Sequence, residues 1–109
     1  MEIREERTDD LAVLVPISRV DSATAKAFEA RVLAVVNSGA PKIVIDFSEL
    51  DYISSAGLRV VLVGAKMTRA PRRFALCGMK PHIREIFDVS GFAKILQIHA
   101  DRAAVTAAL

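Results

Sequence analysis

The chain has 109 residues, of which 52% are hydrophobic, and its formal net charge at pH 7 is +2. A chain of this length and hydrophobic content can build one compact domain, here residues 1–109, and disorder is not expected. Its Lys and Arg residues are scattered without interleaved aromatic residues, so we expect no nucleic-acid binding.

The cysteine content and the N-terminal residues indicate where the protein works. The single cysteine, Cys77, cannot form an internal disulfide, which fits a reducing compartment. Residues 1–7 are too acidic and polar for a signal peptide, and the longest apolar stretch, residues 60–65, is far shorter than the ~20 residues of a membrane-spanning helix. We expect a cytoplasmic protein with no direct membrane insertion, whose attachment to any membrane would come through a partner.

The N-terminal segment predicts two strands followed by a helix. Residues 3–7 and 11–17 are predicted strands, and the intervening Asp9-Asp10 favours a hairpin. Asp21 and Ser22 are candidate N-caps for a helix that runs to about Asn37. The apolar stripe of this helix has helical spacing and consists of Phe28, Val32, Val35 and Val36.

The middle of the chain predicts a central strand and a second helix. Residues 42–47 are apolar and β-branched, which is typical of a buried strand. A helix pattern follows from about residue 55 to 70 and is stopped by Pro71. The next strand covers residues 73–77 and ends at Gly78.

The C-terminal part continues the alternation. Pro81 suits the first turn of a helix that extends to Val89 and is closed by Ser90-Gly91. Residues 95–98 form a weak final strand, and Asp101 caps an alanine-rich helix to Leu109. Strands and helices joined by short connections predict an α/β domain with a mixed, mostly parallel sheet of four to five strands and about four helices.

The second helix carries more apolar residues than one buried face requires. Leu58, Val61, Leu62 and Ala65 form one stripe, and Val60, Val63 and Met67 form another. The second stripe is either buried under the first or third helix or left free for a partner, and the sequence favours neither.

Two serines precede this helix, in the sequence Ser54-Ser55-Ala56-Gly57-Leu58. A helix N-terminus has free N–H groups and a positive dipole end, which favour added negative charge, so the turn suits a phosphorylation switch. The same position suits an ordinary serine cap. No Glu or Gln lies three residues after either serine, so a capping box is absent.

Catalytic and metal-binding patterns are missing from the chain. It contains no Gly-x-Ser-x-Gly elbow, no dinucleotide fingerprint and no Walker loop. His82 and His99 have no metal-ligand spacing to Cys77 or to each other, and we expect both on the surface. We predict a protein that is not an enzyme, uses no cofactor and holds no metal, with Cys77 as a core residue.

With the serine turn placed between a strand and a helix, the chain resembles the STAS domain family, and more narrowly the bacterial anti-sigma factor antagonists. The segment from Asp46 to Leu58 is similar to the family signature of a strand-end Asp, a serine turn and Gly-Leu. Two further segments match, Val20-Asp21-Ser22-Ala23-Thr24 and Val89-Ser90-Gly91-Phe92. The resemblance covers essentially the whole chain.

The resemblance implies a partner-switching role. A serine-kinase anti-sigma factor of the histidine-kinase-like ATPase type would phosphorylate Ser55, with Ser54 as the alternative acceptor. The unphosphorylated protein would bind this kinase and release the sigma factor or another target. A metal-dependent serine phosphatase would remove the phosphate.

The resemblance also implies which residues meet the partner. Asp46 would have a supporting role at the end of its strand. The implied partner-binding residues lie on the two turns and on the second helix: Asp21, Ser22, Thr24, Ser54, Ser55, Ala56, Gly57, Leu58, Arg59 and Leu62.

Two other functions are open on the sequence. One is a STAS subunit of a bacterial lipid-transport membrane complex, which needs the apolar second helix but no reactive Ser55. The other is a small-ligand sensor or minor enzyme with a cleft at the strand ends, for which catalytic groups are lacking.

Overall fold

The computed structural model describes residues 1–109. Its strands are β1 (Ile3–Thr8), β2 (Leu11–Pro16), β3 (Ser18–Val20), β4 (Lys42–Asp46), β5 (Leu50–Ile53), β6 (Arg73–Cys77) and β7 (Gln97–His99). Its helices are α1 (Ala25–Asn37), α2 (Ser55–Met67), α3 (Pro81–Ser90), the short 3₁₀ helix η1 (Phe92–Lys94) and α4 (Arg102–Ala108).

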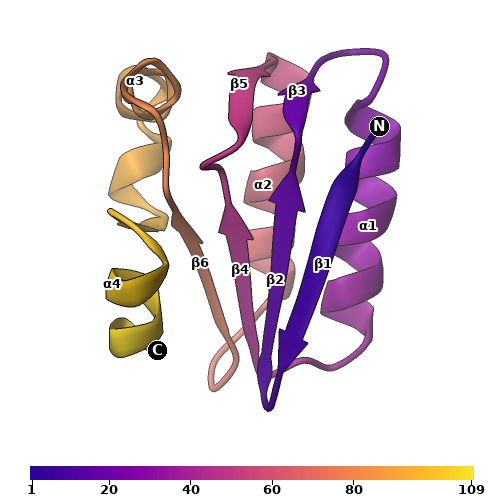
Figure 1. The fold of residues 1–109 in the computed structure, drawn as a ribbon, viewed down its shortest axis with the longest axis vertical. Helices are drawn as coiled ribbons and strands as arrows, with labels where there is room; N and C mark the ends of the chain where they lie inside the picture. The colour runs from indigo at the N-terminus through magenta and orange to yellow at the C-terminus, as the bar shows by residue number, and fades with distance from the viewer.

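A five-stranded sheet in the order β1-β2-β4-β6-β7 forms the centre of the molecule. β1 pairs antiparallel with β2, whereas the β2–β4, β4–β6 and β6–β7 pairs are parallel. The predicted α/β class, the mostly parallel sheet and the four α-helices are confirmed. Figure 1 shows α1 and α2 behind the sheet and α4 on its other side.

The two faces of the sheet bury separate hydrophobic clusters. The larger cluster lies under α1, α2 and α3 and includes Phe28, Phe47 and Phe87, all fully buried. The smaller cluster lies on the opposite face, where Val105 of α4 packs against strand residues that include Cys77. Burial raises the pKa of the Cys77 thiol to about 12, so this cysteine is an inert core residue, as predicted.

A second, two-stranded sheet was missed by the sequence prediction. β3 and β5 pair in parallel and stand above the main sheet next to the start of α2 (Figure 1). Both strands are very short, and the Asp51-Tyr52 centre of β5 is exposed, so neither has the apolar run that marks a buried strand.

Three predicted boundaries shift by two residues or more in the structure. α1 begins at Ala25, because residues 21–24 form a separate turn. α2 ends at Met67, where the Thr68 hydroxyl donates to the Gly64 carbonyl and closes the last turn. The final strand lies at 97–99 and not at 95–98, because the amides of Ile95 and Leu96 donate to the Phe92 carbonyl at the end of η1.

The apolar residues of the two stripes of α2 are buried to different degrees. Leu58, Val60 and Val61 are buried, whereas Leu62 and Val63 are half-buried and Met67 is 44% exposed. α1 and α2 approach closely, since a Cβ built on Gly64 would lie 2.8 Å from Val32 Cγ1. Burial within the fold therefore accounts for Val60, while Leu62 on the first stripe and Val63 and Met67 on the second keep apolar surface accessible. None of the helices is long and apolar enough to cross a membrane.

Candidate functional site

The parallel pairing of β3 with β5 brings the serine turn next to the Asp21 turn. Val20 and Ile53 are register partners at the ends of the two strands, and the Ser54 amide donates to the Val20 carbonyl at 2.8 Å. Two segments more than thirty residues apart in sequence therefore leave neighbouring strands at the same point.

The two serines occupy different positions at the start of α2. Ser54 is the N-cap, with an extended backbone and a side-chain oxygen that accepts from the Gly57 amide at 3.2 Å. Ser55 is the first residue of the helix, is exposed, and its hydroxyl makes no hydrogen bond within the protein. The structure thus gives the capping role to Ser54 and leaves the Ser55 hydroxyl accessible.

Gly57 allows the first turn of α2 to sit directly on the small sheet. A Cβ at this position would lie 2.7 Å from Ile53 Cγ1 and 2.8 Å from Val20 Cγ1. Real Cβ atoms do not approach other side chains this closely, so a larger residue would push the helix start and both serines away from β3 and β5.

The Asp21 turn is built around one carboxylate, not around a helix cap as we predicted. Asp21 Oδ1 accepts from the Ala23 and Thr24 amides, both at 3.0 Å, and the Asp21 amide donates to Thr24 Oγ1 at 2.9 Å. These local bonds form a closed turn that delays the helix, so Thr24 takes the N-cap position. Ser22 is exposed at the tip of this turn.

Arg19 connects the Asp21 turn to β5. Its Nε donates to Asp21 Oδ2 at 3.0 Å, and its guanidinium carbon lies 5.1 Å from the centre of the Tyr52 ring. Burial alone would raise the pKa of Asp21, but the hydrogen bonds from Thr24 and Ala23 and the charge of Arg19 lower it below the usual value. Asp21 is therefore a charged anchor of this surface.

Two grooves flank the exposed edge of α2. One, of about 160 Å³, lies between α1 and α2 and is lined in part by Lys26 and Val60. The other, of about 340 Å³, is lined by Ser55, Leu58 and Leu62 together with Ser90 and Phe92, which lie beyond α2 in the sequence. Arg59 lines both grooves and forms no ion pair, which leaves an unpaired cation one helical turn after Ser55.

Most of the predicted partner-binding residues come together on this surface. Ser54 to Arg59 lie at the start of α2, Leu62 lies about one turn further along it, and the Asp21–Thr24 turn lies beside the helix start. Gly57 is the exception, because it is buried against Ile53 and Val20. Ser90 and Phe92 were not predicted as site residues, although they belong to the Val89-Ser90-Gly91-Phe92 segment that matches the family. The Arg19–Tyr52 contact was also missed, because it depends on the unpredicted small sheet.

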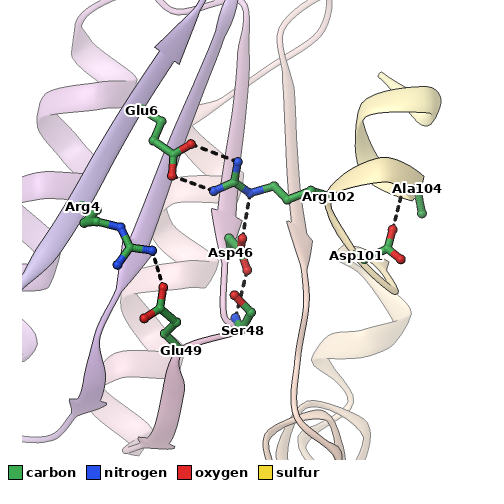
Figure 2. Close-up of polar contacts among 8 residues, drawn as sticks. All are labelled: Arg4, Glu6, Asp46, Ser48, Glu49, Asp101, Arg102 and Ala104. Carbon is green, nitrogen blue, oxygen red and sulfur yellow. Dashed lines mark hydrogen bonds and ion pairs between the residues drawn. The ribbon is translucent and has the colours of Figure 1, made fainter.

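Asp46 lies away from this surface and serves another part of the fold. Figure 2 shows its carboxylate between Ser48 and Arg102: Oδ1 accepts from the Ser48 amide at 2.9 Å and Oδ2 from Arg102 Nε at 2.7 Å. The other side of the Arg102 guanidinium makes a bidentate pair with Glu6, at 3.2 and 3.0 Å. Asp46 therefore ties α4 to the sheet and does not contact the serine turn.

The histidines and carboxylates do not form a metal site. No group of three or more His, Cys, Asp or Glu side chains is arranged to hold a metal ion. His82 is exposed, as predicted, and its Nε2 lies 2.6 Å from the Asp51 carbonyl oxygen. His99 is half-buried, with its Nε2 atom unpaired in the interior, so its predicted surface position was wrong.

A pair of variants tests the different positions of the two serines. Ser54→Ala should lower the free energy of unfolding by about 1 kcal/mol, because the Gly57 amide loses its cap. Ser55→Ala should change it by less than about 0.5 kcal/mol, because its hydroxyl has no partner to lose. Urea unfolding followed by circular dichroism measures both values, and equal losses would contradict the assignment of the cap to Ser54.

Comparisons of the sequence and of the structure with known proteins identify similar chains and similar folds. The STAS domain model matches residues 2–105. A Bordetella bronchiseptica protein named "Putative anti-sigma factor antagonist BtrV" is 41% identical over 99% of this chain and 94% of its own length. A crystal structure of an anti-sigma factor antagonist from Mycobacterium paratuberculosis superimposes with a TM-score of 0.91 at 25% identity, over 97% of this chain and 92% of that one. The Bacillus cell fate determinant SpoIIAA in its phosphorylated form shares the fold, with a TM-score of 0.74 at 21% identity over 99% of this chain and 100% of that one.

Proposed function

Since this chain belongs to the STAS domain family, as its match to the family model and to a 41% identical relative shows, we propose that it is an anti-sigma factor antagonist switched by phosphorylation of Ser55. The B. bronchiseptica relative supports the antagonist role, because the two chains align over nearly their whole lengths. The partner would be a serine-kinase anti-sigma factor of the histidine-kinase-like ATPase type. A metal-dependent serine phosphatase would reset the switch.

The main support for the proposal is that the two serines have different roles at the start of α2. Ser54 keeps α2 capped, so the hydroxyl of Ser55 is free for modification without loss of the helix start. Ser55 also lines the groove between α2 and the Ser90–Phe92 segment, where half-buried Leu62 offers apolar contact. A partner that fills this groove would cover the modified position.

Phosphorylation would change the surface and not the fold. A phosphate adds about −1.5 to −2 charge at neutral pH. At Ser55 the positive end of the α2 dipole favours this charge by roughly 0.3–1 kcal/mol, and Arg59 has the i,i+4 spacing for an ion pair with it. The phosphate would therefore be tolerated in the free protein, whereas burying it unpaired in an interface would cost several kcal/mol.

The intact mass of the protein from its native cells tests the proposal. We expect a fraction of molecules that carry one phosphate, localised to Ser55 by fragmentation. Ser54→Ala should still be phosphorylated and Ser55→Ala should not, with Ser54→Ala as the matched control for loss of one hydroxyl. A phosphate on Ser54 would contradict the assignment of the switch to Ser55. Stable co-purification of unmodified protein with a membrane ATPase would contradict the switch itself and support a transport-complex subunit.

A further inference from the structure

Unpaired positive charge gathers at the end of α2 that lies opposite the serines. Eight of the 15 Lys and Arg side chains form ion pairs with carboxylates. Four of the remaining seven lie within eight residues of one another: Lys66, Arg69, Arg72 and Arg73. No Asp or Glu occurs between Asp51 and Glu85, so the chain supplies no nearby partner in sequence.

One of these four cations, Arg72, stabilises the end of α1. Arg72 donates from Nε to the Ala40 carbonyl at 3.1 Å and from Nη2 to the Val36 carbonyl at 2.6 Å, which satisfies carbonyls at the end of α1. Arg73 donates to Gln97 Oε1 at 3.3 Å. Lys66 and Arg69 are exposed and make no hydrogen bond through their side chains, so their charges are fully available.

Carboxylates at the same end of the molecule do not cancel this charge. The β1–β2 turn, which contains Asp9 and Asp10, lies at the same end as the α2–β6 connection (Figure 1). Asp10 is already paired with Lys42 at 3.4 Å, which leaves Asp9 as the one free carboxylate of this turn. The cations of residues 66–73 therefore outnumber the free carboxylate of this turn.

Apolar side chains are exposed beside these cations. A groove of about 310 Å³ is lined by Arg72 and Arg73 together with Ala65, Phe74 and Ile95. Ile95 is 65% exposed and Met67, at the end of α2, is 44% exposed. Long cationic side chains around protruding apolar residues match the boundary between lipid headgroups and acyl chains.

We infer that this end of the molecule binds the surface of a membrane rich in anionic phospholipid. Lys66, Arg69 and Arg73 would contact headgroup phosphates, and Ile95 would enter the interface. An acidic protein partner fits less well, because such interfaces are built around a larger apolar core with aromatic anchors, and the one aromatic side chain that lines this groove, Phe74, is buried.

Ser55 would remain accessible on a molecule bound to a membrane in this way. Ser55 and Met67 mark the two ends of α2, so a molecule that rests on a membrane through residues 66–73 presents Ser55 away from it. Such binding would be a direct, peripheral contact with the membrane, whereas the sequence predicted attachment only through a partner.

Sedimentation with lipid vesicles tests the inference. The probe is a vesicle of equal parts phosphatidylcholine and phosphatidylglycerol, and vesicles of phosphatidylcholine alone are the control. We expect binding only to the anionic vesicles, with an affinity that falls as salt is added. Lys66→Gln/Arg69→Gln should weaken binding roughly 30-fold, since each cation near an anionic membrane contributes about 1 kcal/mol.

A second double variant makes the test specific to this surface. Lys26→Gln/Arg84→Gln removes the same charge from the start of α1 and from α3, which lie at the opposite end of the molecule from the α2–β6 connection (Figure 1), and should bind the vesicles like the unmodified protein. Equal losses for the two double variants, or no vesicle binding at low salt, would overturn the inference. Binding of polyglutamate through Lys66 and Arg69 without vesicle binding would overturn the lipid assignment in favour of an acidic protein. No kinase is used, so the outcome is independent of the proposed switch.

Discussion

Replacing Ser55 with Asp should weaken binding to the anti-sigma factor by about a hundred-fold or more. The new carboxylate would sit at the first position of α2, on a surface that the proposed partner covers. An unpaired charge that is desolvated in an interface costs several kcal/mol, and each ~1.4 kcal/mol is a factor of ten in affinity. Isothermal titration calorimetry of the purified pair measures the change.

Two companion variants separate charge from shape. Ser55→Asn has nearly the size of Asp without its charge, and Ser55→Ala removes only the hydroxyl. Both should bind the partner within a few-fold of the unmodified protein, and Ser55→Asp should keep a melting temperature close to normal because acidic residues are favoured in the first turn of a helix. Equal affinities for Ser55→Asp and Ser55→Ala would contradict electrostatic exclusion at this position.

The sequence predicted the main sheet and its helices because their patterns are strong. β4 is a short apolar run that begins after Pro41, β6 is one that ends at Gly78, and α1 and α2 carry apolar residues at helical spacing. β3 and β5 were not predicted because strands of three and four residues are defined by their pairing and not by their own composition. Local hydrogen bonding also decided the start of α1, where Asp21 bonds to its own turn and displaces the helix by several residues.

The sequence predicted the residues of the candidate site but not how the fold brings them together. The three motifs could be found from sequence alone, yet their convergence on the start of α2 depends on the β3–β5 pair and on the position of η1. The sequence also could not assign the cap, since Ser54 and Ser55 are equivalent until the backbone places one hydroxyl on the Gly57 amide.

Asp46→Ala should lower the free energy of unfolding by about 2–3 kcal/mol, the largest loss we expect from a single polar residue. The Asp46 side chain is only 8% exposed, and its carboxylate holds the Ser48 amide and Arg102 at once. Removing one partner of a buried pair typically costs about 3–5 kcal/mol, and the half-exposed Arg102, which keeps Glu6, should reduce that cost. Urea unfolding measures the loss, and Glu6→Ala, on the exposed side of the same arginine, should cost less than about 1 kcal/mol.

The same variant determines whether Asp46 acts through the fold or through the partner. In a double-mutant cycle, Asp46→Ala and Arg102→Ala should show strong coupling, because both remove the same link between β4 and α4. The proposed phosphorylation of Ser55 by a partner kinase should then proceed at the normal rate in Asp46→Ala under conditions where the variant stays folded, since the carboxylate faces α4 (Figure 2). Loss of phosphorylation without loss of stability would instead place Asp46 at the partner interface, as a supporting residue of the site itself.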